Sequence, residues 1–467
     1  MTQNKETRKE NKMGTMPVKK LIVNMSVPMM ISMLVQALYN IVDSIFVAQI
    51  SENALAAVTF AFPLQNLMIA LGSGTGVGIN ALLSKSLGEK NFDRSDAAAG
   101  NGLFLTLLNT IAFVFIGLFV TGPFIQSQTS VPEIITAGDT YLGIVCTFSI
   151  GLFFQMTFER LLQSTGMTVL SMISQMTGAI INIIFDPILI FGLCGFPKLS
   201  VAGAAYATVL GQCVAASIGL FLNLRYNKDI HFSLRSIFHP ALSIIGKIYF
   251  VGVPSILMMS IGSVMTYFMN LILVGFSTTA AAVFGVYFKL QSFFFMPVFG
   301  LNNGLIPVLA YNYGAREKAR IDQALRFSLL LAICIMLCGT ITFELIPGVL
   351  LEMFNASPEL MSMGIHALRI IAVHFPLAAC GIVLGSIFQA FGQSFYSLIV
   401  SLCRQLVVLI PVAWLLSLTG NVNNVWWCFL IAEIVSVTLS FVFLFLFLSF
   451  LFLSSFLSLL SLFLSLF

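Results

Sequence analysis

The sequence predicts an all-α polytopic membrane protein, with twelve transmembrane helices arranged as two parallel six-helix repeats. Of its 467 residues, 58% are hydrophobic and only 9% are charged, whereas about a quarter are charged in a soluble protein. Twelve apolar stretches are long enough to cross a bilayer, and the chain matches itself at a shift of 226 residues. This composition excludes a water-soluble enzyme and a disordered chain.

A membrane-spanning helix needs about 20 mostly apolar residues. The stretches that meet this requirement lie near residues 21–48, 54–83, 98–122, 135–158, 169–192, 200–224, 248–275, 281–310, 327–352, 361–390, 397–418 and 425–450. With a cytoplasmic N-terminus, 18 of the 22 Lys and Arg residues fall in inner segments, and Lys198 alone lies in an outer loop. The positive-inside rule therefore predicts a cell-membrane protein with both termini cytoplasmic.

The internal repeat places polar and glycine residues in one register, which chance similarity between apolar helices does not produce. Identities at the 226-residue shift include Pro28/Pro254, Gln65/Gln291, Gly78/Gly304, Asp96/Asp322, Glu133/Glu359, Gln163/Gln389 and Gly166/Gly392. Because each repeat holds an even number of spans, both enter the membrane in the same sense and should face each other across a cleft.

The repeat divides the chain into five parts. We expect a cytoplasmic segment (1–20), an N-lobe of six helices (21–224), a cytoplasmic linker (225–247), a C-lobe of six helices (248–442) and a tail (443–467). The tail contains only Phe, Leu and Ser. Such low complexity predicts no functional site there.

Ionisable residues within apolar helices are costly and mark ion or substrate paths. Three acids of the first half, Asp43, Glu159 and Asp186, correspond at the 226-residue shift to Met269, Gly385 and Val412. The second repeat keeps the fold without these charges, so the charges are expected to serve function.

The surroundings of two acids suggest a cation or proton site. Asp43 shares a helix face with Gln36 and Asn40, and this polar face must point into the protein. Asn182 lies one turn before Asp186, and the following proline frees a backbone carbonyl there. The alternative is that both acids are solvated at helix ends. Glu159 either attracts cationic substrates or forms an interfacial ion pair with the adjacent Arg160.

Other ionisable groups are expected to be structural. Glu344 and Glu433 have no polar partner near them in the sequence, and His366 and His374 are interpreted as core or interfacial residues. The chain contains no HExxH, GxSxG or GxxxxGK[ST] motif. We therefore expect that the protein is not an enzyme and that it binds no cofactor and no nucleic acid. We also expect that its transport is driven by an ion gradient.

Several motifs resemble the multidrug and toxic compound extrusion (MATE) family. These are QALYNIVDSIFVAQI (36–50), LGEKNFDRSDAA (87–98), NIIFDPILIFG (182–192) and VAGAAYAT (201–208). The resemblance implies a MATE-like fold with a cation site for H⁺ or Na⁺ at Asp43, Asn182 and Asp186. It also implies that Tyr141 lines the cavity and that Glu159 is a second acid. A sodium site in the C-lobe is not expected, because Met265, Met269 and Gly385 occupy those regions.

Three functions follow from these observations. The first is a monomeric antiporter that exchanges H⁺ or Na⁺ for amphipathic, mostly cationic drugs. The second is a flippase for lipid-linked oligosaccharide, which should line its cleft with several basic residues; Lys289 and Arg404 are the only ones deep in the second half. The third is a channel, which would need a continuous polar pore.

Overall fold

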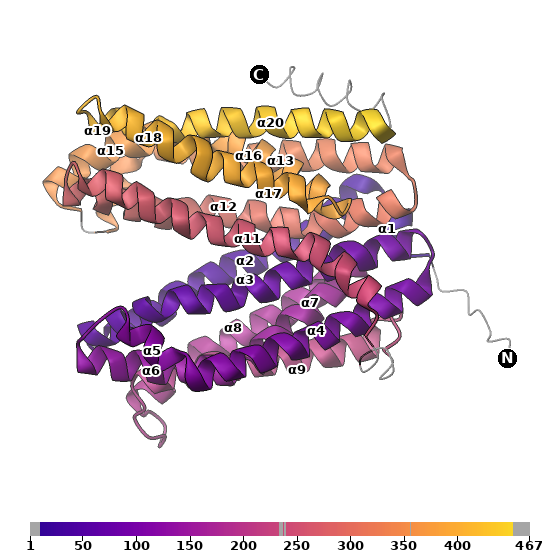
Figure 1. Cartoon of the computed structure of the whole chain (residues 1–467), viewed down its shortest axis with the longest axis horizontal. Coiled ribbons are helices and arrows are strands. Elements are labelled where there is room, and N and C mark those ends of the chain that lie inside the picture. The colour runs from indigo at the N-terminus through magenta and orange to yellow at the C-terminus, as the bar shows by residue number, and fades with distance from the viewer. Residues whose placement is uncertain (1–9, 233–236, 238–239, 355, 452–467) are drawn as a thin grey trace.

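The computed structural model describes residues 10–232, 237, 240–354 and 356–451, and every regular element within them is a helix. Two groups of long helices lie beside each other, indigo to magenta and red to yellow in Figure 1. These described residues confirm the predicted all-α class. The predictions for residues 1–9, for 233–236 and 238–239 of the linker, and for the tail beyond Leu451 lie outside the described residues.

The first group, here called the N-lobe, holds six spans and two short helices. The spans are α2 (Val18–Ala48), α3 (Glu52–Gly88), α4 (Phe92–Phe119), the pair α6 (Pro132–Thr147) and α7 (Ile150–Ser164), α8 (Thr168–Phe191) and α9 (Val201–Tyr226). The short helices are α1 (Lys12–Thr15) and α5 (Thr121–Gln126).

The second group, the C-lobe, repeats this order. It contains α11 (Leu242–Val274), α12 (Thr278–Gly314), α13 (Lys318–Leu345), α14 (Pro347–Glu352), the pair α15 (Pro358–Ala372) and α16 (Phe375–Ala390), α17 (Ser394–Leu402), a π-helix η1 (Cys403–Leu409), α18 (Ile410–Ser417), α19 (Val422–Val425) and α20 (Cys428–Leu451). In the described residues, ten helices could each span a membrane, and the two bent pairs bring the number to twelve if each counts as one span.

The predicted repeat is visible in the helix boundaries. Adding 226 to the bounds of α3, α4 and α5 gives the bounds of α12, α13 and α14. Both bent pairs turn by 46°. The fold is therefore two copies of one six-span unit.

Local chemistry repeats with the same shift. Ser51 and Ser277 each precede a helix and accept a hydrogen bond from the backbone N–H three residues later, which satisfies a free donor of the first turn. Gly166 and Gly392 have φ angles of +88° and +78°, a region that favours glycine. The recurring Gln-x-x-Gly motif thus belongs to a turn of the fold.

The stretch predicted near 135–158 differs from the structure. It extends from Pro132 to Ser164 and breaks between α6 and α7. The hydropathy pattern places the end of this stretch too early, because the last turns of α7 carry Glu159, Arg160 and Gln163. These polar side chains lie inside the protein and not at the membrane surface.

The lobes meet through α2 with α12 and α3 with α11. Glycines allow this contact: a Cβ on Gly74 would lie 2.9 Å from the Gly252 carbonyl oxygen, and one on Gly304 would lie 2.8 Å from the Met25 carbonyl oxygen. Small residues permit such backbone approach. These contacts mark one end of the molecule, which also holds α1 and which we call the closed end. The lobes diverge toward the opposite, open end (left in Figure 1).

Candidate functional site

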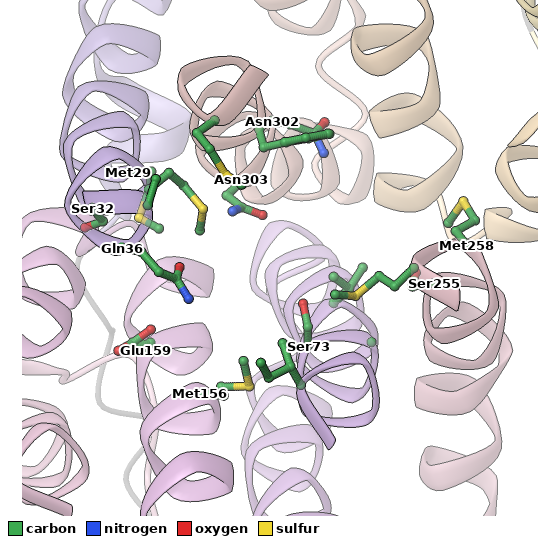
Figure 2. Close-up of a pocket in the computed structure, with 18 of the residues that line it drawn as sticks. Met29, Ser32, Gln36, Ser73, Met156, Glu159, Ser255, Met258, Asn302 and Asn303 are labelled. Atoms are coloured by element: carbon green, nitrogen blue, oxygen red, sulfur yellow. The ribbon is translucent and has the colours of Figure 1, made fainter. Parts of the chain in front are cut away.

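A cavity of about 750 Å³ lies between the lobes and is lined by both. Figure 2 shows Ser32, Gln36 and Glu159 of the N-lobe facing the same space as Ser255 and Met258 of the C-lobe. Its walls combine amide and hydroxyl side chains with the methionines Met29, Met33, Met156, Met258, Met259 and Met296. Flexible thioethers adapt to ligands of different shape.

The two predicted acids, Asp43 on α2 and Asp186 on α8, are brought together. Their carboxyl groups lie within hydrogen-bonding reach of each other. Asp186 is fully buried, and the buried Oδ1 of Asp43 receives no hydrogen bond from the described residues. Two facing carboxylates repel unless a proton or a cation lies between them, so this pair is chemically suited to hold either one.

Asn182 fixes the position of this acid pair. In the orientation that satisfies both of its groups, Nδ2 donates to Asp186 Oδ2 at 3.2 Å and Oδ1 accepts from the Thr208 backbone N–H at 3.2 Å. Pro187 lies inside α8, which leaves the Ile183 carbonyl without its helical donor. The predicted Asn-x-x-x-Asp-Pro cluster is therefore one connected site, to which the sequence reading did not assign Thr208.

The carboxyl pair lies just behind the cavity wall. Asn40, Asn182 and Thr208 line the cavity, whereas Asp43 and Asp186 do not. An ion on the pair is thus separated from a cavity ligand by one layer of polar side chains. A direct overlap of drug and cation on the same two oxygens is not what this geometry favours.

Tyr141 also lies behind the wall. It is 2% exposed, near Asp43, and its side chain hydrogen-bonds with Gln65. It does not line the cavity, although Gln65 and Tyr39 do. Tyr39 lies near both acids. The expectation that Tyr141 lines the cavity is corrected: Tyr39 and Gln65 occupy that wall.

Gln36 and Asn40 follow the prediction that their helix face points inward. Both line the cavity, and Gln36 Oε1 accepts a hydrogen bond from Gln175 Nε2 at 3.2 Å. Gln175 lies on α8, so this bond joins the two helices that carry the acids.

Glu159 is 7% exposed and lines the cavity. Its Oε1 accepts from Gln155 Nε2 at 2.9 Å. The expected alternative of an ion pair with Arg160 is not found: Arg160 Nη1 donates to Gln163 Oε1 at 3.0 Å and, across the lobe interface, to Asn303 Oδ1 at 3.1 Å. Glu159 therefore presents an acid to the cavity without a basic partner among the described ion pairs.

Two acids of the C-lobe have partners that the sequence reading missed. Glu433 on α20 pairs with Arg404 on η1 at 2.5 Å, and Glu344 Oε2 lies 3.9 Å from Arg369 Nε. The expectation that these acids lack polar partners is corrected. Both partners are on other helices, so neither pairing is apparent from local sequence, although Arg404 is itself an ionisable residue in an apolar helix.

The described residues contain no cluster of three or more His, Cys, Asp or Glu side chains that could hold a metal. A Na⁺ ion at the acid pair would need amide or hydroxyl oxygens in addition, as hard cations prefer oxygen ligands. Thr208 offers a hydroxyl oxygen next to Asn182, whereas the Asn182 oxygen faces Thr208 because its amide nitrogen donates to Asp186. The donor set thus fits either a proton or a small hard cation.

Comparison with known proteins now identifies the family. The MatE family model matches residues 28–188 and 254–415, one segment in each lobe. The chain belongs to the MATE family. It is 27% identical over 425 residues to the multidrug export protein MepA of Staphylococcus haemolyticus, covering 90% of this chain and 92% of that protein.

Other MATE relatives extend this picture. An FAD transporter of Shewanella oneidensis is 26% identical over 413 residues, covering 87% of this chain and 90% of that protein. A solved outward-facing conformation of a multidrug resistance MATE family transporter of the MOP superfamily superposes with a TM-score of 0.88 at 26% identity, covering 94% of this chain and 97% of the other. These relatives support a multidrug efflux transporter.

Proposed function

We propose that this MATE protein exports amphipathic, mostly cationic drugs in exchange for H⁺ or Na⁺, by alternating access of its two lobes. The carboxyl pair Asp43–Asp186 binds the coupling ion, and Asn182 positions the Asp186 carboxyl group by a hydrogen bond. Glu159 attracts the cationic group of the drug within the cavity. Transport of small molecules, and not catalysis, is the activity proposed.

The observation that carries this proposal is the buried carboxyl pair directly behind the cavity wall, in which no basic side chain is paired with either acid among the described ion pairs and Asp43 Oδ1 has no hydrogen-bond partner. Its C-lobe counterparts Met269 and Val412 are apolar, so the pair does not belong to the shared fold. A buried pair of this kind, next to a cavity that opens between two lobes, supports ion-coupled movement of those lobes.

The proposed orientation places the open end outside and both termini in the cytoplasm of the cell membrane. The bias of basic residues supports this orientation, and so does the likeness to an outward-facing relative. The protein is proposed to act as a monomer in the lipid bilayer without cofactor or nucleic acid.

The flippase alternative is less well supported. A lipid-linked pyrophosphate would require several basic side chains in the cavity, and among the described residues only Arg160 and Arg404 line it. Arg160 already donates to Gln163 and Asn303.

The test is accumulation of the cationic dye ethidium in cells that express the chain, with the proton and sodium gradients collapsed separately. We expect expression to lower dye accumulation, and collapse of one gradient alone to restore it. Unchanged accumulation in expressing cells would refute drug export, and export that survives loss of both gradients would refute ion coupling.

A further inference from the structure

Arg404 is the only basic side chain on the C-lobe wall of the cavity among the described residues. It lies on η1, is 28% exposed, and its Nη1 donates to the almost fully buried Glu433 at 2.5 Å. The proposed coupling chemistry uses neither residue. Their N-lobe counterparts at the 226-residue shift are Gly178 and Ala207, so the ion pair is absent from the other repeat.

The backbone departs from the repeat at the same place. The N-lobe helix α8 is continuous, whereas its C-lobe equivalent becomes the π-helix η1 at Cys403–Leu409. In the N-lobe, Gly178 and Gly211 bring α8 and α9 into backbone contact, because a Cβ on Gly211 would lie 2.6 Å from the Gly178 carbonyl oxygen. In the C-lobe, Arg404 and Val437 stand at these two positions. π-helical turns within α-helices are frequent at functional sites.

The guanidinium has capacity for a second partner. Arginine carries five N–H donors in a planar fork, and Glu433 is the only described acceptor bonded to Arg404. Arg404 lines the cavity, and none of its other guanidinium nitrogens is both buried and unpartnered. Glu433 holds the group in place from behind.

We propose that Arg404 is a binding subsite for the carboxylate of an exported compound. The inference rests on the proposed drug export and names a second recognition point for it. A compound that carries both an amine and a carboxylate would place its amine toward Glu159 on one lobe and its acid on Arg404 of the other. Such a ligand would contact both lobes through its charged groups, whereas a ligand with only an amine or only a carboxylate would have one of these two contacts.

The charge of the site favours a carboxylate over a phosphate. Glu433 neutralises Arg404, and no second basic residue of the described chain lines this wall, whereas phosphate recognition gains from several cationic groups. The neighbouring Ser401 and Gln405 hydrogen-bond with each other, and they supply neutral polar groups beside the arginine.

The test compares three compounds: an amphoteric fluoroquinolone, its ester, which lacks the acid, and ethidium. The variant is Arg404→Gln with Glu433→Gln, because removing Arg404 alone would leave a buried unpaired carboxylate. We expect apparent affinity for the acid-bearing drug to fall by about tenfold, as for loss of a charged hydrogen bond, with the ester and ethidium little changed. Glu433→Gln alone should keep or raise affinity for the acid.

The matched control is Glu344→Gln with Arg369→Gln, the exposed ion pair of the same lobe, which should leave all three compounds unchanged. An equal loss for all three compounds in the Arg404 variant would overturn the subsite and indicate a structural ion pair. Unchanged affinity for the acid would also overturn it. Failure of the wild type to export any compound would instead refute the proposed drug export.

Discussion

At the residue scale, the proposed function depends on how the two repeats differ. Asp43 and Asp186 form a carboxyl pair in the N-lobe, whereas the C-lobe has Met269 and Val412 in their places and carries its own pair, Arg404 and Glu433. Charges retained in one copy only are not needed to build the shared fold. The charged groups at or behind the cavity wall therefore differ between the two lobes.

We expect Asp43→Asn or Asp186→Asn to reduce drug export roughly tenfold or more, because a site that stabilises an ion by charged contacts loses at least that much. Shape is retained, so membrane insertion and yield should stay normal. The measurement is dye efflux normalised to the amount of protein. Glu344→Gln, an exposed acid outside the cavity, is the control; equal losses in all three variants would show a general packing effect.

Acidification should release a bound cationic drug. Protons that bind the carboxyl pair add positive charge one layer behind the cavity, and by linkage drug and ion each weaken the other's binding. Binding of a fluorescent cationic drug to purified protein, measured from mildly alkaline to mildly acidic buffer, checks this. The pH dependence of drug binding should be smaller in Asp186→Asn. If drug affinity in the wild type were insensitive to both pH and Na⁺, this coupling would be excluded.

The sequence predicted the acid pair because both acids lie in the motifs at 36–50 and 182–192 and lack counterparts in the second repeat. It could not predict that the pair lies behind the cavity wall, since the depth of a side chain depends on packing between helices. Tyr141 was expected in the cavity from the family resemblance, which does not fix the depth of a side chain. Thr208 lies in the motif VAGAAYAT (201–208), but its contact with Asn182 joins two helices and is not apparent from the sequence.

At the element scale, the repeat register was the most predictable feature. One shift of 226 residues accounts for the bounds of α3 and α12 and for both bent helix pairs. The bends themselves were not predicted, because hydropathy reports burial in lipid and not helix direction. The π-helix η1 was equally unpredictable: it packs against α20, and contacts between helices leave no local pattern in the sequence.

We expect Gly78→Val to loosen the closed end. Its Cβ would clash with the Ile248 carbonyl of α11, and overpacking of this kind costs about 1–3 kcal/mol. That cost should raise the ratio of molecules with separated lobes to molecules with closed lobes at this end by roughly tenfold. Spin labels on Asp93→Cys and Ala319→Cys, in a background without other cysteines, would report a longer inter-lobe distance. Gly246→Val is the matched control, because a Cβ there meets nothing within 4 Å; a similar change in both would refute the clash.

At the scale of the whole molecule, the loop after α8 and the turn after α12 lie at opposite ends. Thr168, which begins α8, bonds to the Asn24 carbonyl at the closed end, so the loop that carries the exposed Cys194 is at the open end. In intact cells, a membrane-impermeant thiol reagent should label Cys194 when the other cysteines are replaced. A cysteine at Ala319 should react only after the cells are opened. The reverse pattern would invert the proposed topology.

The short helix α1 joins the two lobes at the closed end. On the N-lobe side, Asn11 Nδ2 donates to the Thr165 carbonyl at 2.9 Å and to Asp229 Oδ2 at 2.7 Å. On the C-lobe side, Arg320 Nη2 donates to the carbonyls of Met13 and Met16 at 3.0 and 2.7 Å. Lys12 Nζ donates to Asn24 Oδ1 at 2.7 Å on the N-lobe side, and Asn312 Nδ2 donates to the Met13 carbonyl at 3.2 Å on the C-lobe side. Together these bonds oppose a motion that separates the lobes here.

We therefore expect Asn11→Ala to favour separation of the lobes at the closed end. Each hydrogen bond contributes about 0.5–1.5 kcal/mol, or more where a charged group takes part, so loss of the two partly buried Asn11 bonds should raise the separated population several-fold. The spin-label pair on Asp93→Cys and Ala319→Cys measures that population. Asn53→Ala is the control, because Asn53 bonds to Glu133 within a single lobe and its removal leaves the link between lobes intact. If Asn11→Ala and Asn53→Ala gave the same distances, α1 would be a passive cover, and the glycine contacts alone would hold the closed end.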